Sequence, residues 1–226
     1  MEQYNISISL SDKTLQALYK SGWQLQVFKG VKGAGAGKPI LWYALTEFSS
    51  KIALKWGEQF GGYVSNQRLV SGVTVDVSSY RQMEPGQRMT LNPDGTTAVS
   101  TLGGKSGAFT FHNAKKEEWL CGITQSVNGS QPSPLCAFHL YGLTFDFMEP
   151  YEKIVLVFAS TPVDTGTVIE EALAASVEIV LSPDQPNIEL GFDMNESWDS
   201  KGSQYVKVHP EPIQLASALI IPWSGE

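Results

Sequence analysis

Lys51-Ile-Ala-Leu-Lys-Trp56 alternates charged or small residues with apolar ones, and Lys153-Ile-Val-Leu-Val-Phe158 repeats the pattern 102 residues later. Alternation with a period of two places every second side chain on one face of a β-strand. Each segment begins with Lys and ends with a large aromatic residue. Both segments therefore predict strands, and their likeness suggests that one derives from the other by duplication.

Further matches occur in the same order on either side of these two segments. The offset between them changes only in the stretches that separate matched blocks, where loops differ in length. Such collinear matches indicate an internal duplication. The matched pairs are Trp23 with Trp119, Val31–Gly33 with Val127–Gly129, Pro39-Ile40 with Pro134-Leu135, Tyr43–Leu45 with Phe138–Leu140, Gly62–Val64 with Gly166–Val168, and Val73–Val77 with Val177–Leu181.

The glycine-rich segment Gly103–Gly107 lies where the first copy ends, and such segments are common boundaries. It divides the chain into residues 1–103 and residues 104–226. Each part has about 100 residues, a common size for a β-sandwich. The sequence thus predicts an all-β fold: an internally duplicated antiparallel β-sandwich, built as two similar units or as one sandwich with pseudo-twofold symmetry.

Period-two segments fill both predicted copies, and helical patterns are scarce. Ser11 followed by Leu15 and Leu18 predicts a short helix that ends at Gly22. One or two short helices are therefore expected. The predicted strands are Tyr4–Leu10, Leu25–Val31, Ile40–Leu45, Lys51–Trp56, Ser71–Val77, a hairpin over Met89–Val99, Gly107–Phe111, Trp119–Val127, Leu135–Leu140, Lys153–Ala159, Ser176–Leu181, Ile188–Asp193 and Tyr205–Val208.

Composition excludes several classes of protein. The 226 residues include 16 Lys and Arg against 23 Asp and Glu, for a formal net charge of -7, so a nucleic-acid partner is not expected. The longest apolar runs span six residues, whereas a membrane helix needs about 20. The start, Met1–Asn5, lacks the basic and apolar regions of a signal peptide. We expect a cytoplasmic protein, or one released without such a peptide.

Motifs for metal, cofactor or nucleotide chemistry are absent from the sequence. The loop Gly30–Pro39 lacks the glycine spacing and the hydroxyl residue of a phosphate-binding loop, and is expected to be a flexible hairpin loop. His112, His139 and His209 lack metal-ligand spacing. The segment Asp193–Asp199 resembles the start of a calcium loop but lacks its glycine. Neither a metal nor a cofactor is predicted.

The sequence predicts neither a disulfide nor a catalytic nucleophile. Cys121 and Cys136 lie on successive predicted strands, and a long intervening loop would place them out of register. Buried free thiols are therefore favoured over a disulfide. No G-x-S-x-G motif marks a catalytic serine. The sequence thus favours a protein that is not an enzyme.

Aromatic residues carry the functional hypothesis. The chain has 6 Trp, 8 Tyr and 10 Phe, and several lie at strand ends or in turns. Rings at such places stack on sugars or enter a lipid headgroup layer, because they are apolar with a polar edge. Trp23, Trp56 and Trp119 recur with the repeat and are expected in the core. The predicted ligand-binding residues are Tyr80, Trp198, Trp223, Trp42 and Tyr151.

Three function hypotheses follow from these observations. The first is a non-enzymatic recognition protein for carbohydrate or lipid headgroups, such as a defence lectin or a toxin component, with peripheral membrane contact and oligomer formation left open. The second is a pore-forming or membrane-active toxin, in which Thr96–Phe111 or the helix over Asp12–Ser21 refolds into lipid. The third is an enzyme with a small-molecule site between the two units.

Overall fold

The computed structural model describes residues 2–223, which form a mostly β protein with two short helices. The elements are β1 (Gln3–Leu10), α1 (Asp12–Lys20), β2 (Gln24–Gly33), β3 (Gly37–Pro39), β4 (Tyr43–Leu45), β5 (Lys51–Gly57), β6 (Phe60–Ser65), β7 (Ser79–Met83), β8 (Arg88–Leu91), β9 (Thr97–Ser100), β10 (Phe109–Asn113), β11 (Trp119–Gln125), β12 (Ser133–Pro134), β13 (Cys136–Leu140), β14 (Phe145–Ala159), β15 (Glu171–Ala172), β16 (Ser176–Val180), β17 (Asn187–Asp193), β18 (Ser197–Asp199), β19 (Val206–His209), β20 (Ile213–Gln214), α2 (Leu215–Leu219) and β21 (Ile220–Pro222).

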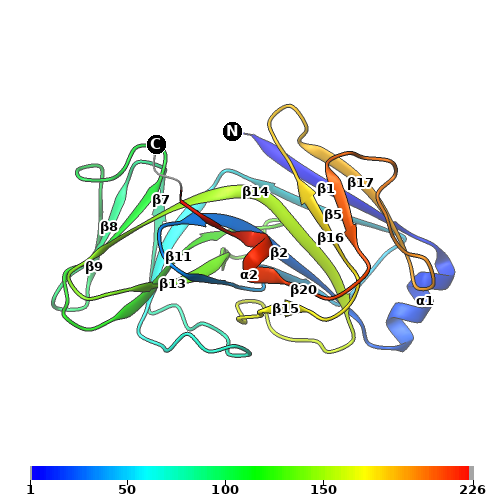
Figure 1. Ribbon diagram of the computed structural model, residues 1–226, viewed down its shortest axis with the longest axis horizontal. Coiled ribbons are helices and arrows are strands. Elements are labelled where there is room, and N and C mark those ends of the chain that lie inside the picture. The colour runs from blue at the N-terminus through cyan, green and yellow to red at the C-terminus, as the bar shows by residue number, and fades with distance from the viewer. Residues whose placement is uncertain (1, 224–226) are drawn as a thin grey trace.

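The described strands form four sheets. One has the order β18-β17-β1-β5, and a second has β3-β13-β11-β6-β7 with β12 on β11. The largest follows β19-β16-β14-β10-β8-β9, with β2 paired to β14 and both β4 and β21 paired to β2. A small pair joins β15 to β20. In Figure 1, the long strands β14 and β2 cross the molecule and connect the end that holds β7, β8 and β9 with the end that holds β1, β5 and α1.

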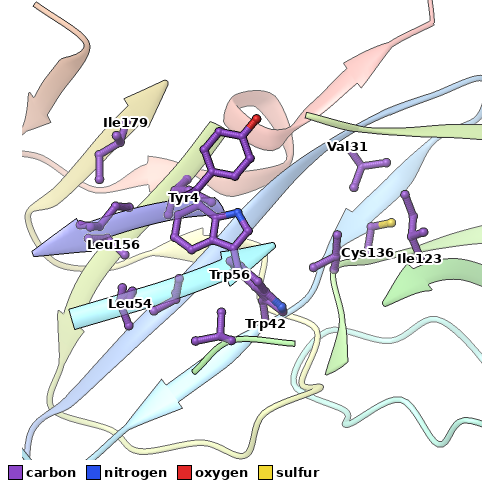
Figure 2. Close-up of a cluster of buried hydrophobic side chains, with 14 of the residues drawn as sticks. Tyr4, Val31, Trp42, Leu54, Trp56, Ile123, Cys136, Leu156 and Ile179 are labelled. Carbon is purple, nitrogen blue, oxygen red and sulfur yellow. The ribbon is translucent and has the colours of Figure 1, made fainter. Parts of the chain in front are cut away.

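The main hydrophobic core lies between the three larger sheets. Figure 2 shows Tyr4, Trp56 and Trp42 at its centre, and the rings of Trp42 and Trp56 meet edge to face at 5.5 Å. A smaller cluster lies on the opposite face of β2 and β14, where Phe28 and Val155 pack under α2. This cluster and α2 therefore cover the outer face of β14 over the second half of the strand. They do not cover the outer face of its first half.

Several local predictions are confirmed. The Ser11 hydroxyl accepts a hydrogen bond from the backbone N–H of Thr14 at 3.1 Å and caps α1, and Gly22 adopts a positive φ of 65° after the helix ends. The hairpin is also present, because β8 and β9 pair around the turn that contains Pro93 and Gly95. Cys121 and Cys136 are buried free thiols.

Other local predictions are wrong. Ser71–Val77 forms no strand, because Gly72 turns with a φ of 78° and only an isolated bridge joins Thr74 to Thr167. The loop Gly30–Pro39 is not a hairpin, since it carries the chain from the sheet of β2 to the sheet of β3. The sheets are also mixed rather than purely antiparallel: β1–β17, β10–β8 and β2–β21 are parallel pairs.

Strand pairing does not show the expected duplication. Lys51–Trp56 lies in β5, an edge strand beside β1, whereas Lys153–Phe158 lies in β14, between β2 and β16. Similar sequence patterns thus occupy different positions in different sheets. Each of the three larger sheets also combines strands from both sides of the expected boundary at residue 103.

Candidate functional site

Two of the predicted ligand-binding rings lie in the core. Trp42 is 1% exposed and donates its indole N–H to the backbone oxygen of Gln125 at 2.9 Å. Trp198 is 5% exposed, donates to the backbone oxygen of Ala175 at 3.1 Å and stacks on Phe158. Each indole N–H has a backbone partner, so burial costs it nothing in hydrogen bonding. Both residues are therefore corrected from ligand-binding residues to core residues.

Tyr80 is exposed and lies in a different sheet from Tyr151. It sits on β7, an edge strand, with 39% of its surface exposed. Its ring packs over Gly61, where an added Cβ would lie 2.2 Å from the ring. Tyr80 therefore belongs to a surface of the six-stranded sheet, whereas Tyr151 and Trp223 lie beside the nine-stranded one.

The structure places Tyr151 and Trp223 on either side of β2. Tyr151 lies on β14, and Trp223 follows β21, which runs parallel to β2. The backbone N–H of Trp223 donates to the oxygen of Gly33 at 2.9 Å, which anchors the last described residue to β2. Between them, the Lys32 ammonium lies 5.3 Å from the centre of the Tyr151 ring and 3.2 Å from a carboxylate oxygen of Glu149.

A second lysine joins Trp223 to another aromatic residue of β14. The Lys105 ammonium lies 4.3 Å from the Trp223 ring centre and 5.6 Å from that of Phe147. Within residues 2–223, no carboxylate forms an ion pair with Lys105. Lys105 belongs to the glycine-rich loop between β9 and β10, and Leu102 on the same loop is 77% exposed.

The turn before β14 adds exposed apolar side chains. Tyr141, Leu143 and Phe145 are 58%, 63% and 49% exposed. Leu143 adopts a φ of 59°, which is unfavourable for a bulky side chain. Phe145 stacks on His112 with ring centres 4.2 Å apart. We define the β14 strip as Phe145, Phe147, Tyr151 and Trp223 together with Lys32 and Lys105.

Side-chain alternation explains how β14 presents this strip. Phe145 and Phe147 point outward, whereas Asp146 and Met148 between and beyond them are buried. Burial raises the pKa of Asp146 from 3.8 to about 6, although backbone N–H groups of Phe147 and Ala34 oppose this shift by donating to the carboxylate. A buried carboxyl group thus lies directly behind the strip.

Asp146→Asn is expected to stabilise the protein at neutral pH and to have little effect at pH 4. The folded protein binds this proton more tightly than the unfolded chain, so the free energy of unfolding falls as pH rises from about 4 to about 6. Two pH units correspond to about 3 kcal/mol, the upper limit of the gain at pH 7. Urea unfolding of both proteins at several pH values measures it. Parallel pH profiles would contradict the assignment to Asp146.

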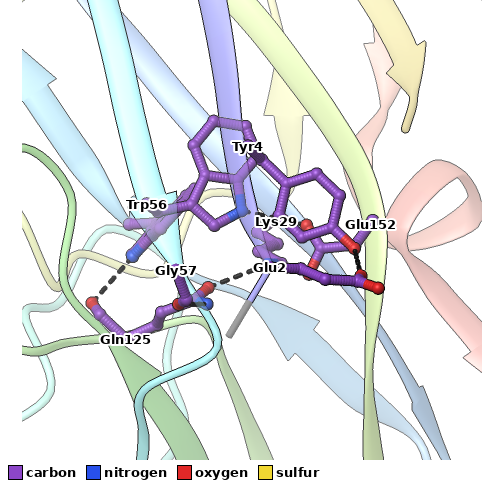
Figure 3. Close-up of polar contacts among 8 residues, drawn as sticks. Glu2, Tyr4, Lys29, Trp56, Gly57, Gln125 and Glu152 are labelled. Carbon is purple, nitrogen blue, oxygen red and sulfur yellow. Dashed lines mark hydrogen bonds and ion pairs between the residues drawn. The ribbon is translucent and has the colours of Figure 1, made fainter. Parts of the chain in front are cut away.

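A buried ion pair lies inside the core, near the irregular part of β14. Lys29 is fully buried, and its ammonium lies 2.5 Å from Glu152 and 2.8 Å from the side-chain oxygen of Gln125. Trp56 donates its indole N–H to the other Glu152 oxygen at 2.9 Å (Figure 3). The rings of Trp42 and Trp56 lie 5.4 and 5.5 Å from the ammonium. Burial lowers the pKa of Lys29, and Glu152 opposes that shift.

Sequence reasoning missed this pair, although a signal was present. Leu25, Val27 and Val31 occupy alternate, inward positions of β2, and Lys29 falls in the same series. A lysine at an apolar position of an alternating strand indicates a buried partner. The partner, Glu152, is 123 residues away and lies where the pairing of β14 with β2 shifts register between Tyr151 and Ile154.

Neither the side-chain chemistry of the described residues nor comparison with known proteins assigns the chain to a family. Within residues 2–223, no three His, Cys, Asp or Glu residues lie close enough to hold a metal ion. No helix of that range has the length and apolar character needed to cross a membrane. The described residues form a β-rich protein of four sheets, which include a curled half-barrel. Comparisons with protein-family models, with curated proteins and with solved structures found no match.

Proposed function

We propose that the protein is a non-enzymatic recognition protein that binds anionic lipid headgroups through the β14 strip. The observation that carries the proposal is the position of Lys105 between the rings of Trp223 and Phe147, on the outer face of a sheet. Aromatic rings with a polar edge suit the headgroup layer of a bilayer, and lysines beside them attract lipid phosphates.

Exposed leucines extend this surface and favour a lipid over a free sugar. Leu102 and Leu143 are among the most exposed large apolar side chains of the described residues. Leu102 lies three residues from Lys105, and Leu143 lies two residues before Phe145. Sugars are bound by ring faces and hydrogen-bonding groups, whereas leucine tips gain free energy mainly by leaving water for an acyl layer.

Trp223→Ala is expected to weaken binding to vesicles of phosphatidylcholine and phosphatidylserine at least about tenfold, because the lost indole removes apolar contact area. Lys105→Gln is expected to weaken the same binding about fivefold and to leave binding to pure phosphatidylcholine unchanged, since a lysine near an anionic surface contributes about 1 kcal/mol. Co-sedimentation measures both effects. Tyr205→Ala is the matched control, because Tyr205 is 40% exposed beside β19, at the other edge of the large sheet.

Other outcomes of the same experiment identify the alternatives. Binding to an array of soluble oligosaccharides without binding to vesicles would replace the lipid proposal with a carbohydrate one. Release of an entrapped dye would favour a pore-forming protein. For that function Thr96–Phe111 would have to leave the fold, in which it supplies the edge strand β9, the Lys105 loop and part of β10.

A further inference from the structure

A second concave site lies at the far end of β14 from the strip. A cavity of about 530 Å³ opens between the start of β2, the end of β14 and the segment that follows it. Gly30 and Gln26, the partners of Tyr151 and Val157 on β2, are four residues apart, so the cavity lies about 13 Å along the sheet from the strip. Its lining includes Trp23, Gln26, Val157, Val163, Val168 and Ile169.

The cavity wall is apolar and fixed by backbone hydrogen bonds. Val157 and Val168 are 2% and 1% exposed, and they form part of two separate buried clusters. The segment around Val168 is held because Val168 donates its N–H to Val73 at 3.0 Å and Gly72 donates to Val168 at 2.8 Å. A preformed apolar cavity of this volume suits a small organic ligand.

Most polar groups at the cavity already have partners. The Gln26 amide donates to the side chain of Gln24 at 3.1 Å, and Gln24 exchanges hydrogen bonds with the backbone of Val163 at 3.0 and 3.1 Å. Glu170 forms an ion pair with Lys38, which lowers the pKa of that carboxyl group. These groups therefore have little capacity left for a ligand.

Glu171 differs from Glu170, the other carboxylate of the lining. It belongs to the short strand β15 and is half-buried. No ion pair or side-chain hydrogen bond connects its carboxylate to another residue within residues 2–223. An unpaired carboxylate beside apolar walls favours a ligand with a positive charge at one end, because a charge-assisted contact is strong where water is partly excluded.

We propose that this cavity binds a small amphipathic cation, with its apolar body against Trp23 and Val163, which are partly exposed in the lining, and its ammonium group on Glu171. The site is separate from the β14 strip and does not depend on the proposed lipid binding. Its ligand is a free small molecule, since the volume is that of a drug-sized compound and the charged group lies at the cavity itself.

Three probes that share an eight-carbon backbone and differ in their terminal group test the proposal. Octylammonium, octanol and octanoate are each titrated calorimetrically into the full-length protein. We expect octylammonium to bind at least tenfold more tightly than octanoate, with octanol between them. Glu171→Gln is expected to reduce octylammonium binding to the level of octanol and to leave octanol binding unchanged. Glu196→Gln, which removes an exposed carboxylate outside the cavity, is expected to change none of the three affinities.

A further variant tests where the alkyl chain of the probes binds. Ala174→Phe places a ring in the lining and is expected to abolish binding of all three probes, with the thermal unfolding transition retained as evidence of folding. Failure of the wild-type protein to bind any probe would overturn the proposal. So would an octylammonium preference that survives in Glu171→Gln. Trp223→Ala is expected to leave all three affinities unchanged, which separates this site from the strip.

Discussion

Glu152→Leu is expected to destabilise the protein by about 3–5 kcal/mol, because it leaves the Lys29 ammonium buried without its counter-charge. Lys29 is fully buried, and Glu152 is the carboxylate with which it forms an ion pair. Gln125 supplies one neutral oxygen at 2.8 Å, which compensates only part of the cost of removing the ammonium from water. The variant also removes the acceptor of the Trp56 indole N–H.

The double variant Lys29→Met with Glu152→Leu is expected to recover most of that loss. Replacing both members of a buried pair by apolar residues of similar size is often neutral, since neither charge must then be desolvated. Urea unfolding of the wild type, both single variants and the double variant measures the coupling between the two residues. Additive effects of the single variants would show that the pair makes no net interaction in the folded protein.

Residues 1–103 expressed alone are expected not to fold. Within residues 2–103 the strands pair only as β1–β5, β2–β4, β6–β7 and β8–β9, so no sheet of three strands remains. A two-stranded pair is marginally stable in water at best. The pairings that join these strands into sheets involve β10, β11, β13, β14, β17 and β21.

Circular dichroism and thermal unfolding of residues 1–103, of residues 104–226 and of the full chain measure this expectation. We expect a cooperative thermal transition for the full chain and none for residues 1–103. The circular dichroism spectrum of residues 1–103 is expected to be that of a disordered chain already at the lowest temperature. A cooperative transition in the isolated first segment would instead support the two-unit organisation that the sequence matches suggest.

Secondary-structure elements are predictable from the sequence where they depend on residues close together in the chain. The Ser11 cap and the alternation of Tyr4–Leu10 each depend on neighbouring residues, and both elements are present as expected. The expected strand Ser71–Val77 alternates equally well but is absent, because its backbone groups bind loop residues 166–168 rather than a strand. Which strands become neighbours depends on contacts across the chain, and alternation alone does not specify them.

The candidate site, too, is only partly predictable from neighbouring residues in the sequence. Tyr151 and Trp223 were identified from their polar or turn-like surroundings, and both retain partial exposure beside lysines. Trp198 has equally polar neighbours in sequence, yet its ring packs on Phe158 and Phe192. Sequence neighbours describe the backbone position, whereas the direction of the side chain decides whether a ring meets solvent or core.

Parallel pairing between strands that are far apart in the sequence has a consequence for synthesis on the ribosome. Strand β1 pairs in parallel with β17, where Asn5 faces Asn187, and β2 pairs in parallel with β21, where Val31 faces Ile220. The N-terminal strands therefore emerge long before their partners are translated. At about 5–20 residues per second, β1 waits on the order of ten seconds or more for β17. During that interval the edge of β1 that pairs with β17 is available to chaperones, and these two sheets are complete only after β17 and β21 have been synthesised.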